Sequence, residues 1–368
     1  MNAIEFYNAR HGKYSVQDEM LRILINQGYI KNKTHVINLI GLFSVGRMLQ
    51  ISGPINRFDK FAFNFDGTPL PEDANTSDTF TDVALKTAED LWAKAGDKKI
   101  ALYWSGGIDS TVALTALIRT NSDWLNRMVI YASDYSINLE YPLFYETYLK
   151  TANVVLLKDL EFFNPELFSN DRIVVDGTCG DQIWGCNVMK DMGDLRKEPY
   201  ANLFTSDIFN QTVYTVKQHT INYIVEQAEK FPVPIKTVSD LYWMLTFTHK
   251  WDHVRLRMMA SVKDFTKFHS LNSFFNNTYF QKWAMSNLDI KLGNTWNTYK
   301  QPAKDFIYEF TGDNVYRINK LQEGSMGRSI KSGHEQMDLF NLATTNGHTT
   351  YDKIDSAKNL LKACCINT

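Results

Sequence analysis

The sequence predicts an α/β fold, a doubly wound parallel sheet with an added helical subdomain and a small N-terminal region. Apolar runs that fit strands alternate with stretches that fit helices between residues 100 and 176, and this alternation is typical of a parallel sheet. Long aromatic-rich stretches with helical spacing follow between residues 199 and 287, and they predict the helical subdomain. In doubly wound sheets, ligands bind at the carboxyl ends of the strands.

Each predicted element follows from its pattern of apolar residues. Strands are predicted over the apolar runs 100–104, 128–131, 153–157 and 172–176, and helices over 84–92, 111–118 and 139–149. The first of these helices is expected to have its cap at a residue such as Ser77 or Asp78. Trp243, Phe247 and Trp251 recur at helical spacing, which is more typical of a core stripe than of a ligand pocket.

Composition excludes few classes of protein, but it makes some partners and locations less expected than others. A chain of 368 residues is long enough for about two domains. A net charge of −2 gives no overall attraction to nucleic acid, which is disfavoured as a partner without being excluded. We find no secretion signal and no apolar run of about 18 residues, so we expect no membrane partner. The four cysteines form no Cys-x-x-Cys pair, which indicates reduced thiols and a cytoplasmic location. The oligomeric state is not indicated.

The most informative stretch is Ser105–Ser110, with the sequence Ser-Gly-Gly-Ile-Asp-Ser, between a predicted strand and a predicted helix. Its two glycines allow positive φ and a close approach to a ligand. Free backbone N–H groups and the positive end of the helix favour an anion there, and the two serines can add hydroxyl donors. Asp109 fits an anion site if a divalent cation links it to a phosphate.

This stretch resembles the PP-loop of the N-type ATP pyrophosphatases, whose pattern is Ser-Gly-Gly-x-Asp-Ser. In that superfamily the loop grips the pyrophosphate of ATP while a substrate oxygen attacks the α-phosphate and becomes adenylated. An ordinary glycine-rich turn is the alternative interpretation. A Walker-type loop fits less well, because no Gly-Lys-Ser/Thr follows.

A second stretch, 175–185, has the sequence Val-Asp-Gly-Thr-Cys-Gly-Asp-Gln-Ile-Trp-Gly. Taken alone, it is a strand that runs into a small turn. Beside the first stretch, Asp181 becomes a second carboxylate for one Mg²⁺ ion. The stretch resembles the Gly-Glu-Gly-Ala-Asp-Glu-Leu-Phe-Gly segment of the asparagine synthetase family, where the aspartate holds magnesium. The family's first Glu, thought to be the base for the amine, falls on Thr178, and its last Glu falls on Gln182. A threonine cannot take up a proton near neutral pH.

The family also has a late lysine on a loop that reaches back over the phosphates, and Lys320 matches it best. An ammonium group there would offset charge that develops on the α-phosphate and the leaving pyrophosphate. A surface lysine is the alternative interpretation, and Lys300 and Lys304 are lesser candidates for the same role.

The resemblance implies three parts of the chain. Residues 86–330 would form the asparagine synthetase-like domain of the PP-loop ATP pyrophosphatase type, 1–85 an N-terminal region, and 331–368 a tail of unknown role. Glutaminase domains of the family carry a cysteine directly after Met1, whereas Asn2 follows here. We therefore expect no glutaminase, so that nitrogen arrives as free ammonia, as an amine, or from the substrate's own amine in a ring closure.

The implied function is that of an ATP- and Mg²⁺-dependent ligase, which adenylates a small-molecule carboxylate, joins it to an amine or ammonia as an amide, and releases AMP and pyrophosphate. Asp109 and Asp181 would hold Mg²⁺, and Lys320 and Asp109 would be catalytic. The implied ATP-binding residues are Ser105, Gly106, Gly107, Asp109, Ser110, Tyr131, Ala132, Asp176 and Gly177. Two alternatives stay open: a PP-loop enzyme that modifies a nucleobase or tRNA, and a nucleotide-binding protein without ligase activity.

Overall fold

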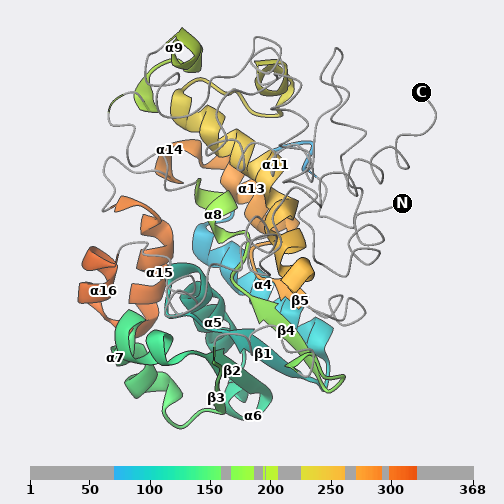
Figure 1. Cartoon of the computed structure of the whole chain (residues 1–368), viewed down its shortest axis with the longest axis vertical. Coiled ribbons are helices and arrows are strands. Elements are labelled where there is room, and N and C mark those ends of the chain that lie inside the picture. Colours follow the sequence, from blue (N-terminus) through green and yellow to red (C-terminus); the bar gives the residue numbers. More distant parts are fainter. Residues whose placement is uncertain are drawn as a thin grey trace, which may run out of the picture. The chain divides into compact units, whose positions relative to one another are not determined.

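Figure 1 shows the computed structural model of the chain. The structure describes residues 70–158, 167–185, 194, 196–205, 225–261, 271–291 and 298–320. Of these, 71–187 and 271–320 belong to one compact unit and 194–261 to another. The predicted tail 331–368 and most of the predicted N-terminal region 1–85 lie outside the described residues, so these divisions stay predictions.

The first unit is built on a five-stranded parallel sheet with the strand order β3-β2-β1-β4-β5. Its strands are β1 (Lys99–Tyr103), β2 (Met128–Ala132), β3 (Val154–Leu156), β4 (Arg172–Asp176) and β5 (Leu271–Ser273). The predicted α/β class and the four predicted strands are confirmed. Strand β5 was missed because three residues carry too little pattern to distinguish a strand from a loop.

The strand order places two loops next to each other. From β1 the chain moves outward through β2 and β3, then returns to pair β4 on the other side of β1, with Leu102 opposite Val175. The connections that leave β1 and β4 therefore diverge at the carboxyl ends of these strands, where ligands bind in sheets of this type. The two motifs, Ser105–Ser110 and 177–185, both begin at these strand ends.

Helices of the first unit lie around this sheet (Figure 1). They are α4 (Phe80–Ala95), α5 (Ile108–Thr120), α6 (Trp124–Arg127), α7 (Pro142–Phe144), α8 (Gly180–Trp184), α13 (Thr278–Ser286), α14 (Leu288–Lys291), α15 (Gln301–Thr311) and α16 (Asn314–Asn319), with the π-helical turns η2 (Ser136–Glu140) and η3 (Tyr145–Leu149).

Two sequence predictions about these helices need correction. Helix α4 begins after Thr79, whose side chain forms a capping box with Asp82, so the cap is neither Ser77 nor Asp78. This pairing satisfies two N–H groups of the first turn at once. The helix predicted over 139–149 is divided into η2, α7 and η3, because Pro142 has no N–H to continue an α-helical ladder.

An aromatic cluster holds four helices of the first unit together. The ring of Phe80 in α4 lies 5.1 Å from Trp184 of α8, 5.7 Å from Phe280 and 5.2 Å from Trp283 of α13, and 6.1 Å from Phe306 of α15. All five rings are buried. Because α8 is part of the second motif and α15 follows Lys300, this packing also fixes the elements that carry the candidate site.

The second unit contains α9 (Tyr200–Thr205) and α11 (Val238–Ser261). Trp243, Phe247 and Trp251 lie on α11 and are buried. The rings of Trp243 and Phe247 stack at 4.7 Å, and Trp251 meets Phe247 edge-on at 5.1 Å. The predicted helix and the interpretation of these aromatic residues as a core stripe are therefore confirmed.

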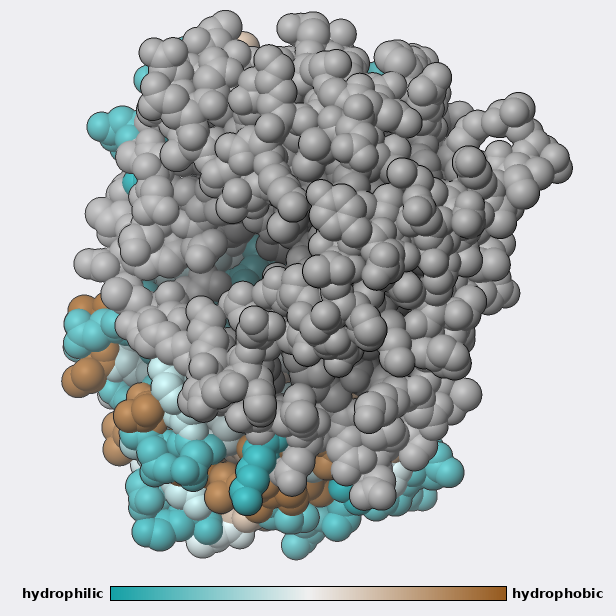
Figure 2. Space-filling view, in the orientation of Figure 1, coloured by the Kyte–Doolittle hydropathy of each residue, from teal (hydrophilic) through white to brown (hydrophobic). Residues whose placement is uncertain are grey.

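The surface beside α7 and α16 is partly apolar. Figure 2 shows brown side chains over these two elements at the left edge of the molecule, and the exposed large apolar residues here include Leu139, Leu143, Val315 and Ile318. Helix α16 buries Tyr316, so this residue anchors it. Among the described residues, no helix has the length and apolarity needed to cross a bilayer.

If the aromatic cluster holds the first unit together, the variant Phe80→Ala loses about 3 to 5 kcal/mol of unfolding free energy, the usual cost of removing a buried aromatic side chain. Urea denaturation measures this loss. The control variant Leu139→Ala, at a position 69% exposed, changes the same quantity by less than about 0.5 kcal/mol. Equal losses in the two variants would contradict this account of the core.

Candidate active site

The loop after β1 is held by its own serines. Ser110 Oγ accepts from the Ser105 N–H at 3.1 Å, lies 2.9 Å from Ser105 Oγ, and donates to the Gly107 carbonyl at 3.1 Å. Ser105 Oγ accepts from the Gly107 N–H at 3.2 Å. Gly106 has a φ of 73°, which is readily adopted by glycine. The two predicted serines thus shape the loop.

The loop leads directly into the positive end of a helix. Helix α5 has 13 residues and begins after Gly107, where no side chain caps the first turn. Uncapped N–H groups and the helix dipole favour an anion at this point. The predicted succession of a strand, a glycine turn and a helix start is therefore present, and anion binding there stays a prediction.

Glycines in the second loop let it pack on the first. A Cβ atom on Gly177 would lie 2.9 Å from the backbone N of Ser110, and one on Gly180 would lie 2.3 Å from Cγ of Asp109. Real Cβ contacts are never this short, so larger residues would push the loops apart. The absence of side chains at these two positions brings Asp109 and Asp181 to the same place.

The two predicted aspartates share one cation, and that cation is Lys300. Its Nζ lies 2.8 Å from Oδ1 and 2.6 Å from Oδ2 of Asp109, and 2.8 Å from Oδ1 of Asp181. The side chain of Lys300 is 2% exposed, whereas those of Asp109 and Asp181 are 21% and 42% exposed. The ammonium group is thus enclosed, while the carboxylates keep some contact with solvent.

Lys300, Asp109 and Asp181 form a triad in which burial and the opposite charge shift pKa values in opposite directions. Burial raises the pKa of Asp109 to about 6, although Lys300 lowers it, and the nearby Asp181 raises it further. Burial alone would lower the pKa of Lys300, but the two carboxylates outweigh that effect and hold it above its ordinary value. Lys300 is therefore a stable cation, and Asp109 is a carboxylate near its titration range at neutral pH.

The backbone of Lys300 is in an unusual conformation. Lys300 caps α15 with a φ of 58°, one of two non-glycine residues with positive φ in the described part of the chain. The preceding Tyr299 donates its hydroxyl to the carbonyl of Gly185 at 2.6 Å, which ties the start of α15 to the second loop. Sparsely populated backbone conformations of this kind cluster at functional sites.

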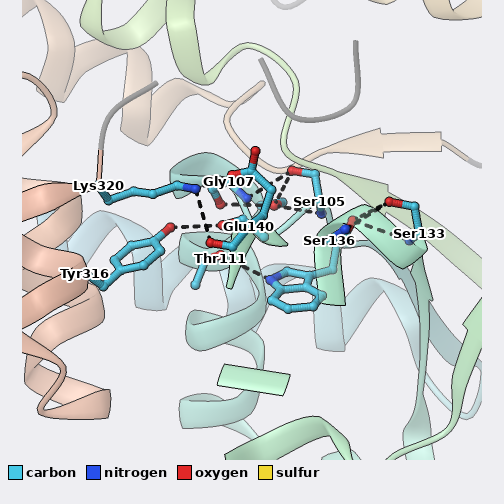
Figure 3. Close-up of polar contacts among 11 residues, drawn as sticks. Ser105, Gly107, Thr111, Ser133, Ser136, Glu140, Tyr316 and Lys320 are labelled. Carbon is cyan, nitrogen blue, oxygen red and sulfur yellow. Dashed lines mark hydrogen bonds and ion pairs between the residues drawn. The ribbon is translucent and has the colours of Figure 1, made fainter. Parts of the chain in front are cut away.

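A second ion pair lies beside the loop (Figure 3). Lys320 pairs with the carboxylate of Glu140 and also donates to its carbonyl at 3.3 Å. The hydroxyl of Tyr316 donates to the Gly106 carbonyl at 3.2 Å, and its ring stacks on Tyr141 at 3.8 Å. Lys320, the predicted catalytic lysine, is therefore held beside the loop by Glu140.

Glu140 reaches the loop because Gly106 has no side chain. A Cβ on Gly106 would lie 2.6 Å from Cβ of Glu140. Glu140 ends η2, which begins at Ser136, and the hydroxyl of Ser136 lies 2.8 Å from that of Ser133 (Figure 3). π-Helical turns are frequent at functional sites, and this one places a buried carboxylate against the loop.

Thr178, which stands in place of the family's glutamate, is part of a hydroxyl network. Its Oγ donates to Oδ1 of Asp176 at 2.6 Å, and it lies 2.6 Å from Oγ of Ser273. The backbone N–H of Thr178 bonds to the same carboxylate oxygen at 3.1 Å. Asp176, a predicted contact to ATP, is buried. Through its hydrogen bonds with Thr178 it orders the start of the second loop.

Tyr131 and Ala132, two of the predicted contacts to ATP, are less favourably placed to touch a ligand. The Tyr131 hydroxyl donates to the Leu167 carbonyl at 3.0 Å and accepts from Arg172 at 3.1 Å, and both Tyr131 and Ala132 are buried. The carbonyl of Tyr131 accepts from the Trp104 N–H at 2.8 Å. Their contact with adenosine stays a prediction.

The donor set suits a hard divalent cation. Two carboxylates from separate strand ends converge on one positive charge, and phosphate oxygens with water would complete the coordination that Mg²⁺ prefers. Within the described ranges no group of three or more His, Cys, Asp or Glu side chains could hold a metal. Asp109 and Asp181 would hold magnesium only together with a phosphate ligand, and this binding stays a prediction.

Comparisons of the chain with protein-family models, with curated proteins and with solved structures give no match. The geometry of the site is therefore the basis for the functional conclusion.

Sequence reasoning identified the two aspartates but missed their partner and two further residues. Lys300 was a lesser candidate for another role, and its position directly before Gln301-Pro302, a helix start, was the available signal. Glu140 and Tyr316 come from elements whose approach to the loop depends on tertiary packing, and no local pattern marks them.

The triad predicts a pH-dependent stability difference between wild type and Lys300→Met. In wild type, the raised pKa of Asp109 lets the folded state bind an extra proton between about pH 4 and 6, so this contribution to stability is lost as pH rises through 6. Without Lys300 the carboxylates repel each other and the pKa of Asp109 rises further. In the variant, stability therefore continues to fall as pH rises above 6.

Urea denaturation at two pH values measures this difference. We expect Lys300→Met to be about 2 kcal/mol less stable than wild type at pH 7.5, a value below that for a fully buried pair because Asp181 is partly exposed. At pH 5 we expect the two proteins to differ little. The control variant Lys282→Met removes an exposed pair with Asp73 and is expected to have little effect at either pH. A difference for Lys300→Met that is constant across this range would contradict the account.

Proposed function

We propose that the protein is an ATP- and Mg²⁺-dependent ligase of cytoplasmic small-molecule metabolism. It would adenylate a carboxylate, form an amide with an amine or ammonia, and release AMP and pyrophosphate. The observation that carries this proposal is the convergence of Asp109 and Asp181 on one cation at the point where the strand order reverses. Ligands of such sheets bind at this point.

The loop residues have the chemistry to bind the pyrophosphate part of ATP. The N–H groups at the start of α5 and the hydroxyls of Ser105 and Ser110 supply donors at one place. Gly106 leaves room for Glu140 against the loop, and Gly177 lets the second loop pack against it. Magnesium held by Asp109 and Asp181 would neutralise phosphate charge and help to position the triphosphate.

Lys320 would stabilise negative charge at the α-phosphate. Its ammonium is held beside Gly106 by Glu140, within the same network as the loop. A positive charge fixed in advance near the reacting phosphorus costs no reorganisation during the reaction. Glu140 is a positioning residue in this scheme, because it acts through Lys320.

The amine half of the reaction has no assigned base. Thr178 cannot accept a proton at neutral pH, and its hydroxyl is engaged with Asp176 and Ser273. This observation favours a second candidate function, a nucleotide-binding protein without ligase activity. In the ligase, the amine would have to arrive unprotonated or lose its proton to another group.

The products formed from ATP test the proposal. We expect purified protein with ATP, Mg²⁺ and a library of small carboxylates and amines to release AMP and pyrophosphate. The variants Asp109→Asn and Asp181→Asn should lower AMP formation about 100-fold or more, the usual cost of losing one element of transition-state electrostatics. Asp97→Asn is the control, since Asp97 lies just before the amino-terminal end of β1, whereas the site lies at the carboxyl end. It should form AMP at the wild-type rate.

Release of ADP and phosphate would contradict the proposal. Tight ATP binding without AMP formation, measured by calorimetry over the same library, would support the second candidate function instead. Unchanged AMP formation in Asp109→Asn would remove that residue from the reaction.

A further inference from the structure

We propose that the ammonium group of Lys300 occupies the divalent-cation position between Asp109 and Asp181 until it pairs with a bound polyphosphate instead. Binding of the divalent cation and binding of the polyphosphate are then coupled through this one side chain. This inference rests on the proposed function and concerns how its site is assembled.

Distances make the two cations mutually exclusive. The Nζ atom of Lys300 lies 2.6 to 2.8 Å from three oxygens of Asp109 and Asp181. A magnesium ion bound by both carboxylates would sit about 2.0 to 2.1 Å from its oxygen ligands, in the same small volume. Lys300 must therefore leave its position before the ion can be held by both aspartates.

Leaving is costly unless another anion is close. The Lys300 side chain is 2% exposed, and a buried charge that loses its partners is strongly disfavoured. Asp109 is followed by Ser110 and lies in the first turn of α5, so the anion-binding loop is adjacent to the triad. A polyphosphate bound in that loop would offer the ammonium a new partner without exposing it to water.

Charges around Lys300 restrict where it can move. Lys304 lies one turn further along α15 and is buried, and burial together with the charge of Lys300 lowers its pKa to about 8. A shift of Lys300 along α15 towards Lys304 is thus opposed by repulsion. Lys320, the other lysine beside the loop, is paired with Glu140. A phosphate bound in the loop is therefore the partner towards which Lys300 can move.

Coupling of this kind is reciprocal. If the polyphosphate takes Lys300 from the aspartates, it strengthens divalent-cation binding, and the cation strengthens polyphosphate binding by the same factor. Removing Lys300 should therefore have opposite effects on the two ligands when each is tested alone. The carboxylate pair becomes open to the cation, whereas the loop loses a positive charge that would bind the phosphate.

Two separate titrations test this inference without any turnover. Binding of Mn²⁺ alone is followed by the electron paramagnetic resonance signal of the free ion. Binding of pyrophosphate alone is followed by calorimetry in the presence of a chelator. For Lys300→Met we expect Mn²⁺ to bind about tenfold tighter than in wild type and metal-free pyrophosphate to bind about tenfold weaker, within the usual range of coupling factors.

Lys320→Met is the matched control for the general effect of losing a positive charge. It removes an ammonium beside the same loop, but one that pairs with Glu140. We expect it to weaken pyrophosphate binding and to leave Mn²⁺ affinity within about twofold of wild type. Lys300→Gln, checked for folding by circular dichroism, provides a second variant with a smaller change in volume.

Mn²⁺ affinity that is unchanged in both Lys300 variants, or that rises equally in Lys320→Met, would overturn the inference. Opposite shifts for the two ligands in the Lys300 variants support it, even in a protein that forms no AMP. Failure of the proposed function and failure of this inference are therefore separate results.

Discussion

A single ammonium group shared by two carboxylates is the interaction on which the site depends. Asp109 comes from the helix after β1, Asp181 from the helix after β4, and Lys300 from the start of α15. Without a positive charge between them, the two carboxylates would repel each other at short range. The charge of Lys300 thus keeps three separate parts of the chain together at the end of the sheet.

Packing beneath the triad makes that arrangement possible. The parallel sheet reverses its order between β1 and β4, and the Phe80 cluster joins the helices α4, α8, α13 and α15. Gly177 and Gly180 remove the side chains that would keep the two loops apart. Tyr316 and the Lys320–Glu140 pair connect α16 and η2 to the Ser105–Ser110 loop. Apolar burial fixes the elements, and charge pairs then fix the side chains at their ends.

Local sequence was sufficient for some of these features and insufficient for others. The strands around residues 100–104 and 172–176 were predictable because buried parallel strands form continuous apolar runs. Asp109 and Asp181 could be paired from sequence because carboxyl ends of parallel strands meet at one edge. The role of Lys300 could not be predicted, since its partners are more than 100 residues away in the chain. Glu140 was missed for the same reason, because its partner Lys320 is 180 residues away in the chain.

The position of a bound divalent cation tests the central claim most directly. A crystal structure with Mn²⁺ and a non-hydrolysable ATP analogue would locate the ion by its anomalous scattering. The account predicts a peak between the carboxylates of Asp109 and Asp181, with the Lys300 ammonium moved onto a phosphate of the analogue. An ion bound elsewhere, with Lys300 still between the two aspartates, would contradict it.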